Sequence, residues 1–213
     1  MFDSPWIVLA AVVAAAFAFR LWLKDYQAQA GGETLTAALP GATPVANWVT
    51  LLAVGGVLVL LAIETAGEYA LGVVDEQSTM TLALCVYSVL VAPLIEEIIF
   101  RGFLYYDKTR ATLIASIVGM SLLFAVLHGH IWSYELPEES ASWALWEAAW
   151  TADYGTKAFF STGILFVRSL WLYYARFMPA NVRRSLIPCV VAHMVGNLGV
   201  VIIKAIQGKV ELM

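Results

Sequence analysis

The sequence predicts an all-α fold, a polytopic bundle of about six transmembrane helices with one further helix at the membrane interface. Two properties of the composition indicate this class. Hydrophobic residues make up 61% of the 213 residues and charged residues only 13%, and the mean hydropathy is +0.79. A soluble domain is about half apolar and about one quarter charged. Apolar surface therefore has to face lipid, and the net charge of −4 excludes a basic face for nucleic acid.

Six apolar segments approach the length of a spanning helix, which is about 20 residues. The expected spans are 5–23, 45–66, 80–105, 111–131, 157–176 and 186–206. The fifth is the weakest because Arg168 interrupts it, so five spans are the alternative. The first span lacks a preceding positive segment and is interpreted as an uncleaved anchor. We expect one membrane domain over 1–213, with two peripheral N-terminal spans in 1–66 and a catalytic core over 80–206.

Basic residues gather at alternate connections. Nine of the twelve Lys and Arg lie in or next to the loops after spans one, three and five. The alternate loops, 67–79 and 132–156, contain acids and no Lys or Arg. Cytoplasmic loops carry the excess of Lys and Arg. The pattern predicts an N-terminus outside the cell, in what we expect to be a prokaryotic cytoplasmic membrane.

The connection "ELPEESASWALWEAAWTADYG" has a different character. Trp143, Trp146 and Trp150 recur at spacings of three and four residues, and Pro137 suits the first turn of a helix. Tryptophan favours the bilayer interface. The segment is therefore interpreted as an amphipathic interfacial helix, with a gate over a membrane cavity as the alternative.

A few polar residues lie well inside the expected spans, where an ionisable group is costly and marks a functional site by default. They are Glu96, Glu97, Arg101, His128, His193 and Asn197. Glu97 and Arg101 are four residues apart and share a helix face, so they can pair. Glu96 points about 100° away on the same helix. His193 and Asn197 also share one face.

The depths of these residues agree. A hairpin with its turn near residue 112 sets Glu96 and His128 at one level, each 16 residues from the turn. His193 lies nine residues beyond Arg184, which is about 13 Å along a helix. We therefore expect the three side chains to meet near the middle of the bilayer.

Such a cluster supports hydrolysis without a Ser or Cys nucleophile. A carboxylate beside a neutral imidazole can take a proton from water, and an imidazole N–H with a carboxamide N–H can hold an oxyanion. Glu96, His128 and His193 could instead bind zinc, which would activate the water, although no HExxH motif is present. A structural reading stays open for the pair of Glu97 and Arg101.

Other groups are interpreted as structural. His130 belongs to no motif, and we expect it to be a packing residue. Cys85 and Cys189 lie in apolar spans and form no CxxC pair, so they are expected to be buried thiols.

Three motifs in order resemble one family. "EEIIFR" fits EExxxR, "FAVLH" from Phe124 fits FxxxH, and "HMVGN" fits HxxxN. Together they resemble the CPBP family of intramembrane proteases (CAAX prenyl protease 2 and bacteriocin-processing, also called Abi). The resemblance covers about residues 80–206.

The resemblance implies a role for each matching residue. Glu96 would be the catalytic carboxylate and His128 would help it to activate water. His193 and Asn197 would form the oxyanion hole, while Glu97, Arg101 and Phe124 would support the site. We expect no cofactor, with zinc as the alternative.

The implied function is an intramembrane endopeptidase that hydrolyses membrane-embedded or lipid-anchored peptides and proteins within the bilayer. The short chain favours peptide processing over CAAX cleavage. The alternatives are a non-catalytic bacteriocin-immunity or scaffold protein of the same fold, and a proton-coupled transporter.

Overall fold

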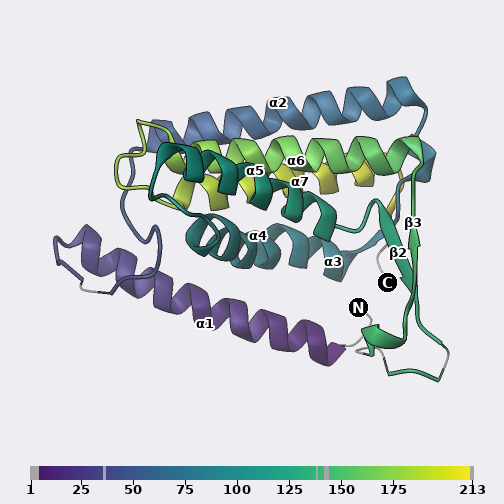
Figure 1. Ribbon diagram of the computed structural model, residues 1–213, viewed down its shortest axis with the longest axis horizontal. Coiled ribbons are helices and arrows are strands. Elements are labelled where there is room, and N and C mark those ends of the chain that lie inside the picture. The colour runs from purple at the N-terminus through teal and green to yellow at the C-terminus, as the bar shows by residue number, and fades with distance from the viewer. Residues whose placement is uncertain (1–4, 36, 138, 142–143, 212–213) are drawn as a thin grey trace.

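The computed structural model describes residues 5–35, 37–137, 139–141 and 144–211. Six long helices dominate this part of the chain and correspond to the six predicted spans. They are α1 (Pro5–Ala30), α2 (Asn47–Leu71), a continuous helix over Leu82–Phe103, α5 (Arg110–Leu127), α6 (Thr156–Phe177) and α7 (Ile187–Ile206). The helices run roughly along the long axis, with α1 set apart from the others (Figure 1).

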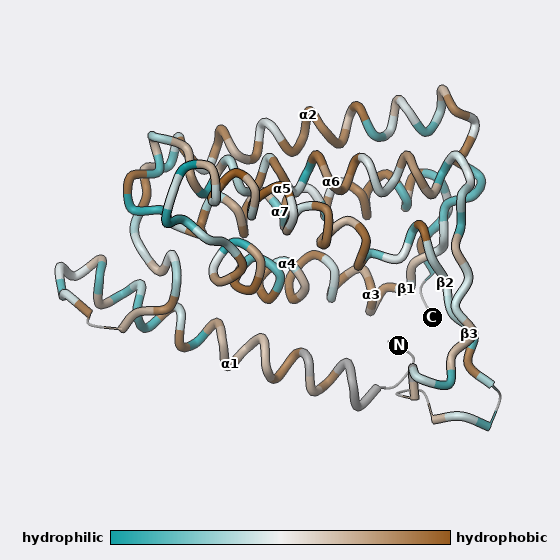
Figure 2. Tube along the Cα trace, in the orientation of Figure 1, coloured by the Kyte–Doolittle hydropathy of each residue, from teal (hydrophilic) through white to brown (hydrophobic). Residues whose placement is uncertain are grey.

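Four of these helices are long and apolar enough to cross a membrane. They are α2, the helix over 82–103, α5 and α7. Hydrophobic residues run along the helices, and hydrophilic ones gather at the connections (Figure 2). The chain is therefore a helical membrane bundle.

Alternate connections lie at the same end of the bundle. Those over 31–46, 104–109 and 178–186 share one end, whereas 72–81 and 128–155 lie at the other (Figure 1). The turn between the third and fourth helices falls at 104–109, a few residues before the predicted position near 112. Thr109 fixes this boundary with a capping box, in which its side chain accepts from the backbone N–H of Thr112 at 3.1 Å.

The helix over 82–103 alternates between two helical forms. It consists of α3 (Leu82–Val86), the π-helical η2 (Tyr87–Val91), α4 (Ala92–Glu96) and the π-helical η3 (Glu97–Phe103). Single π turns inside α-helices are frequently found at functional sites. Here η3 contains Glu97 and Arg101, and the carbonyl of Ser88 in η2 accepts a hydrogen bond from Asn197.

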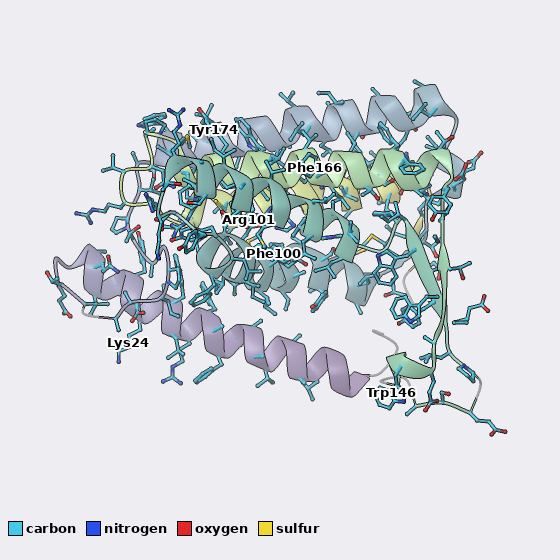
Figure 3. The ribbon with its side chains drawn as sticks, viewed as in Figure 1. Lys24, Phe100, Arg101, Trp146, Phe166 and Tyr174 are labelled. Carbon is cyan, nitrogen blue, oxygen red and sulfur yellow. The ribbon has the colours of Figure 1, made fainter. Side chains whose placement is uncertain are left out.

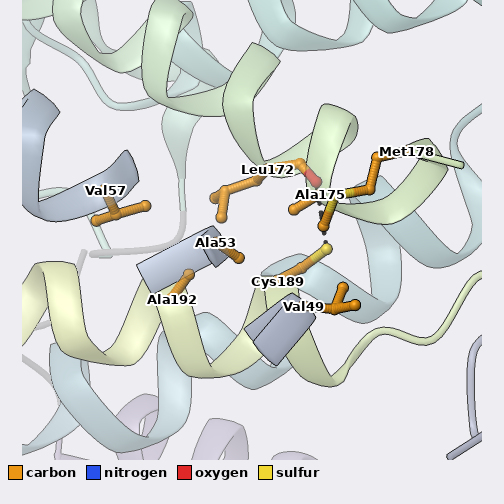
Figure 4. Close-up of a cluster of buried hydrophobic side chains, with 8 residues drawn as sticks. All are labelled: Val49, Ala53, Val57, Leu172, Ala175, Met178, Cys189 and Ala192. Carbon is orange, nitrogen blue, oxygen red and sulfur yellow. Dashed lines mark hydrogen bonds between the residues drawn. The ribbon is translucent and has the colours of Figure 1, made fainter. Parts of the chain in front are cut away.

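The second helix is part of the core, so the prediction that it is peripheral is wrong. Val49, Ala53 and Val57 of α2 are fully buried against α6 and α7, where they meet Leu172 and Cys189 among others (Figure 4). Close approach depends on glycine in α7, because a Cβ at Gly196 would lie 2.5 Å from Val57. The sequence alone does not predict the contact of α2 with α7. A small residue such as Gly196 allows close packing only where another helix lies against it.

The predicted interfacial helix does not form in the described part of its segment. The chain instead makes an antiparallel pair, β2 (Trp132–Glu135) and β3 (Ala149–Ala152), with a short 3-10 turn η4 (Leu145–Glu147) between them. Trp150 packs on Trp132 and Tyr134, with ring centroids 5.1 and 5.2 Å away. This cross-strand aromatic packing replaces the helical face that the tryptophan spacing suggested. Trp143 lies outside the described residues.

Three short elements complete the fold. Strands β1 (Met80–Thr81) and β4 (Val210–Glu211) pair in parallel beside the end of α7, and η1 (Val74–Glu76) follows α2. Cys85 and Cys189 are free and buried, as predicted.

Candidate active site

A cavity of about 720 Å³ lies between the helices, and its lining extends to the connections 72–81 and 128–155, at the end that carries β2 and β3. Five of the predicted site residues line it: Glu96, Phe124, His128, His193 and Asn197. They come from the helix over 82–103, from α5 and its C-terminal boundary, and from α7. The fold therefore gathers side chains that are far apart in the sequence around one space.

Glu97 and Arg101 lie behind this cavity and form the predicted ion pair. Both side chains are completely buried, and Nη1 of Arg101 donates to Oε1 of Glu97 at 3.1 Å. Figure 3 shows Arg101 within the bundle. Its other terminal nitrogen donates to the hydroxyl of Ser169 on α6 at 2.7 Å. The guanidinium also lies over the ring of Phe124, 4.5 Å from the centroid.

The pair does more than neutralise itself, because Glu97 also holds His193. Nδ1 of His193 lies 2.8 Å from Oε1 of Glu97. A carboxylate can only accept, so Nδ1 carries a proton and the ring is fixed in orientation. The other ring nitrogen, Nε2, lies 3.8 Å from Oε2 of Glu96. His193 is therefore set between the two adjacent carboxylates.

Glu96 differs from Glu97 in its exposure. Its side chain keeps 29% of its surface accessible and lines the cavity, whereas that of Glu97 keeps none. Consecutive helical positions point about 100° apart, which allows one carboxylate to be buried in a network and the other to face the cavity.

His128 is oriented by the end of its own helix. Its Nδ1 lies 2.7 Å from the carbonyl oxygen of Phe124, and a carbonyl can only accept, so Nδ1 carries the proton of the neutral ring. The lone pair of Nε2 is then left to accept a proton. The centroids of the Phe124 and His128 rings lie 4.4 Å apart, and Phe124 is itself almost wholly buried. This packing helps to fix the position of the imidazole.

A backbone carbonyl of the helix over 82–103 positions Asn197, because no backbone N–H of that helix bonds to it. The backbone N–H of Ala92 donates to Tyr87 rather than to Ser88, and Pro93, the next possible donor, has no N–H. The side chain of Asn197 supplies the missing bond, with Nδ2 2.7 Å from the Ser88 carbonyl. One N–H of the carboxamide remains for another acceptor.

The described residues do not offer a metal site. No group of three His, Cys, Asp or Glu side chains in this part of the chain is arranged to hold a metal ion. The zinc alternative on Glu96, His128 and His193 stays a prediction that elemental analysis tests.

Further charged residues line the cavity and were not identified from the sequence as site residues, among them Arg168 and Glu64. Arg168 of α6 pairs with Glu64 of α2 across the bundle. The sequence did carry a signal for this pair, because Glu64 and Arg168 each place a charge inside an apolar segment. Such charges pair with one another or face a cavity. His130 also lines the cavity, so it is not packed in a core as predicted.

These observations define a polytopic membrane protein with a buried Glu, His and Asn cluster facing an internal cavity. Residues 78–199 match the model of the family described as type II CAAX prenyl endopeptidase Rce1-like. The match spans more than half of the chain and contains all three motifs, and the chain belongs to this family, which agrees with the CPBP resemblance. No curated protein and no solved structure matches the chain.

Proposed function

We propose that the protein is an intramembrane endopeptidase in which Glu96 and His128 activate water and His193 and Asn197 hold the oxyanion. The observation that carries this proposal is the different burial of two adjacent carboxylates. Glu97 is buried in a network with Arg101 and His193, while Glu96 faces the cavity that His128 shares. The CPBP resemblance gives the catalytic role to Glu96, the carboxylate that faces the cavity.

The first step is attack by water on the scissile carbonyl. Glu96 takes a proton from the water with the help of the Nε2 lone pair of His128. The water oxygen forms a bond to the carbonyl carbon, and the carbonyl electrons move to its oxygen. The resulting oxyanion accepts hydrogen bonds from the free N–H of Asn197 and from His193.

His193 donates to the oxyanion through Nε2. Because Nδ1 already carries a proton toward Glu97, donation from Nε2 requires the doubly protonated ring. Carboxylate oxygens of Glu97 and Glu96 lie 2.8 Å and 3.8 Å from the two ring nitrogens. In the second step the proton held by Glu96 passes to the leaving nitrogen, the C–N bond breaks, and a carboxylic acid and an amine are released.

The substrate is a membrane-embedded or lipid-anchored peptide or protein. The position of the cavity among apolar helices supports this class of substrate. The cavity lining reaches the acidic connections 72–81 and 128–155, which the distribution of Lys and Arg predicts to lie outside the cell. Entry of the substrate from that side follows, and no metal is required.

The proposal is tested with the wild-type protein reconstituted in lipid nanodiscs. Two probes are offered: a farnesylated peptide ending in a CAAX sequence, and a solubilised bacterial membrane-protein fraction. Mass spectrometry of new peptide ends should reveal a defined cleavage in at least one probe. If neither probe gains new ends compared with empty nanodiscs, the non-catalytic immunity or scaffold role replaces this proposal.

A further inference from the structure

The cavity continues well past the catalytic residues along one face of α7. Its lining from this helix includes His193, Asn197, Val200, Lys204 and Gln207, whose spacings of three and four residues place them in one stripe. At 1.5 Å per residue the stripe runs about 15 Å from Asn197 to Gln207 and about 21 Å from His193. The space is therefore an elongated channel with the catalytic residues at its inner end.

Most polar groups in the outer part of this channel are satisfied by the protein. Lys204 donates to the carbonyl of Ser78, and Gln77 donates to Glu68. Gln207 is different. Both ends of its carboxamide, Nε2 and Oε1, are buried and have no hydrogen-bond partner among the described residues.

A buried and unsatisfied carboxamide calls for an explanation, because more than nine in ten buried polar groups are hydrogen-bonded. Gln207 presents one donor and one acceptor side by side. A peptide unit matches both, because it offers a carbonyl and an N–H. Neither an aliphatic chain nor a side chain with a single polar atom satisfies both ends.

We propose that Gln207 is a binding site for the main chain of the substrate, which lies extended along the α7 stripe. This inference rests on the proposed endopeptidase function. An extended chain advances about 3.3 Å per residue, so the 15 to 21 Å separation places Gln207 opposite a peptide unit roughly four to six residues from the scissile bond. The contact selects an extended chain and is indifferent to its side chains.

The test uses the peptide whose cleavage the nanodisc experiment maps, resynthesised with single ester replacements. Each replacement removes one main-chain N–H without adding bulk, and the scan covers eight or so positions on each side of the scissile bond except that bond itself. Wild-type protein is compared with Gln207→Leu. Gln29→Leu, a glutamine of α1 that does not line the cavity, is the matched control.

In the wild type, one ester four to six residues from the scissile bond should lower kcat/KM about three- to tenfold, the usual effect of one neutral hydrogen bond. The same ester should have no effect in Gln207→Leu and its full effect in Gln29→Leu. A purely structural role for Gln207 would lower all rates alike and leave the ester profile unchanged.

Two outcomes separate this inference from the function on which it rests. If the wild type cleaves the peptide and the ester profile is the same in all three proteins, Gln207 does not bind the main chain, and the endopeptidase proposal stands. If the wild type cleaves neither probe, the endopeptidase proposal fails and this inference fails with it.

Discussion

Nδ1 of His193 lies 2.8 Å from Oε1 of Glu97, and this contact ties α7 to the helix over 82–103. The same oxygen accepts from Arg101, which is bonded in turn to Ser169 of α6. Three helices are therefore joined at one carboxylate. This junction orients His193 toward Glu96 and gives Glu97 a supporting role that its neighbour does not have.

Replacing Glu97 should therefore damage the fold as well as the activity. Glu97→Gln leaves the buried Arg101 without its countercharge, and breaking a buried pair costs about 3–5 kcal/mol. Thermal unfolding in detergent, followed by circular dichroism, should show a clear loss. Asp107→Asn removes the acid of the exposed pair with Arg184 and should cost less than about 1 kcal/mol. Equal losses in the two variants would contradict the supporting role.

The two histidines at the end of α5 should behave differently. His128→Ala removes the Nε2 acceptor and should lower kcat by about a hundredfold or more, the usual contribution of a general base. His130→Ala changes a residue that also lines the cavity but belongs to no motif, and it should keep most of the activity. Steady-state cleavage of the mapped peptide measures both, and similar losses would remove the assignment of His128.

The contact between α2 and α7 should depend on the absence of a side chain at Gly196. A Cβ there would meet Val57 at 2.5 Å, whereas one at Gly163 of α6 would meet nothing within 4 Å. Gly196→Ala should destabilise the protein by about 1–3 kcal/mol through overpacking. Gly163→Ala should be neutral or slightly stabilising. Denaturant titration of both variants measures the difference, and equal stability would show that α2 does not pack this closely.

Removal of metal ions should leave the reaction unchanged. Purified protein treated with 1,10-phenanthroline and dialysed should cleave the mapped peptide at the untreated rate, and elemental analysis should find no stoichiometric zinc. Loss of cleavage that added zinc restores would contradict water activation by Glu96 and His128 alone.

The fold class could be predicted because its signal is local. Segments of about 20 apolar residues define spanning helices by themselves, and the six expected segments correspond to the six long helices. The antiparallel pair of β2 and β3 could not be predicted, since the rings of Trp132 and Trp150 pack together across 18 residues of sequence. The core position of α2 escaped prediction for the same reason, because Gly196 reveals its role only beside Val57.

The site shows the same division. The pairing of Glu97 with Arg101 follows from a spacing of four residues and is present. The contact of Glu97 with His193 joins residues 96 positions apart, and no local pattern in either segment predicts it. The hydrogen bond from Asn197 to the Ser88 carbonyl depends on Pro93 and on the π-helical segment η2, which the sequence alone does not predict.

The central claim is that Glu96 is the reactive carboxylate, and cleavage by Glu96→Gln tests it most directly. The variant keeps the size of the side chain and leaves in place the hydrogen bonds that Glu97 makes with Arg101 and His193. Its unfolding temperature in detergent should match that of the wild type, while single-turnover cleavage of the mapped peptide falls at least a thousandfold, or roughly 4 kcal/mol of barrier. A folded Glu96→Gln protein that cleaves at a rate near that of the wild type would contradict the account.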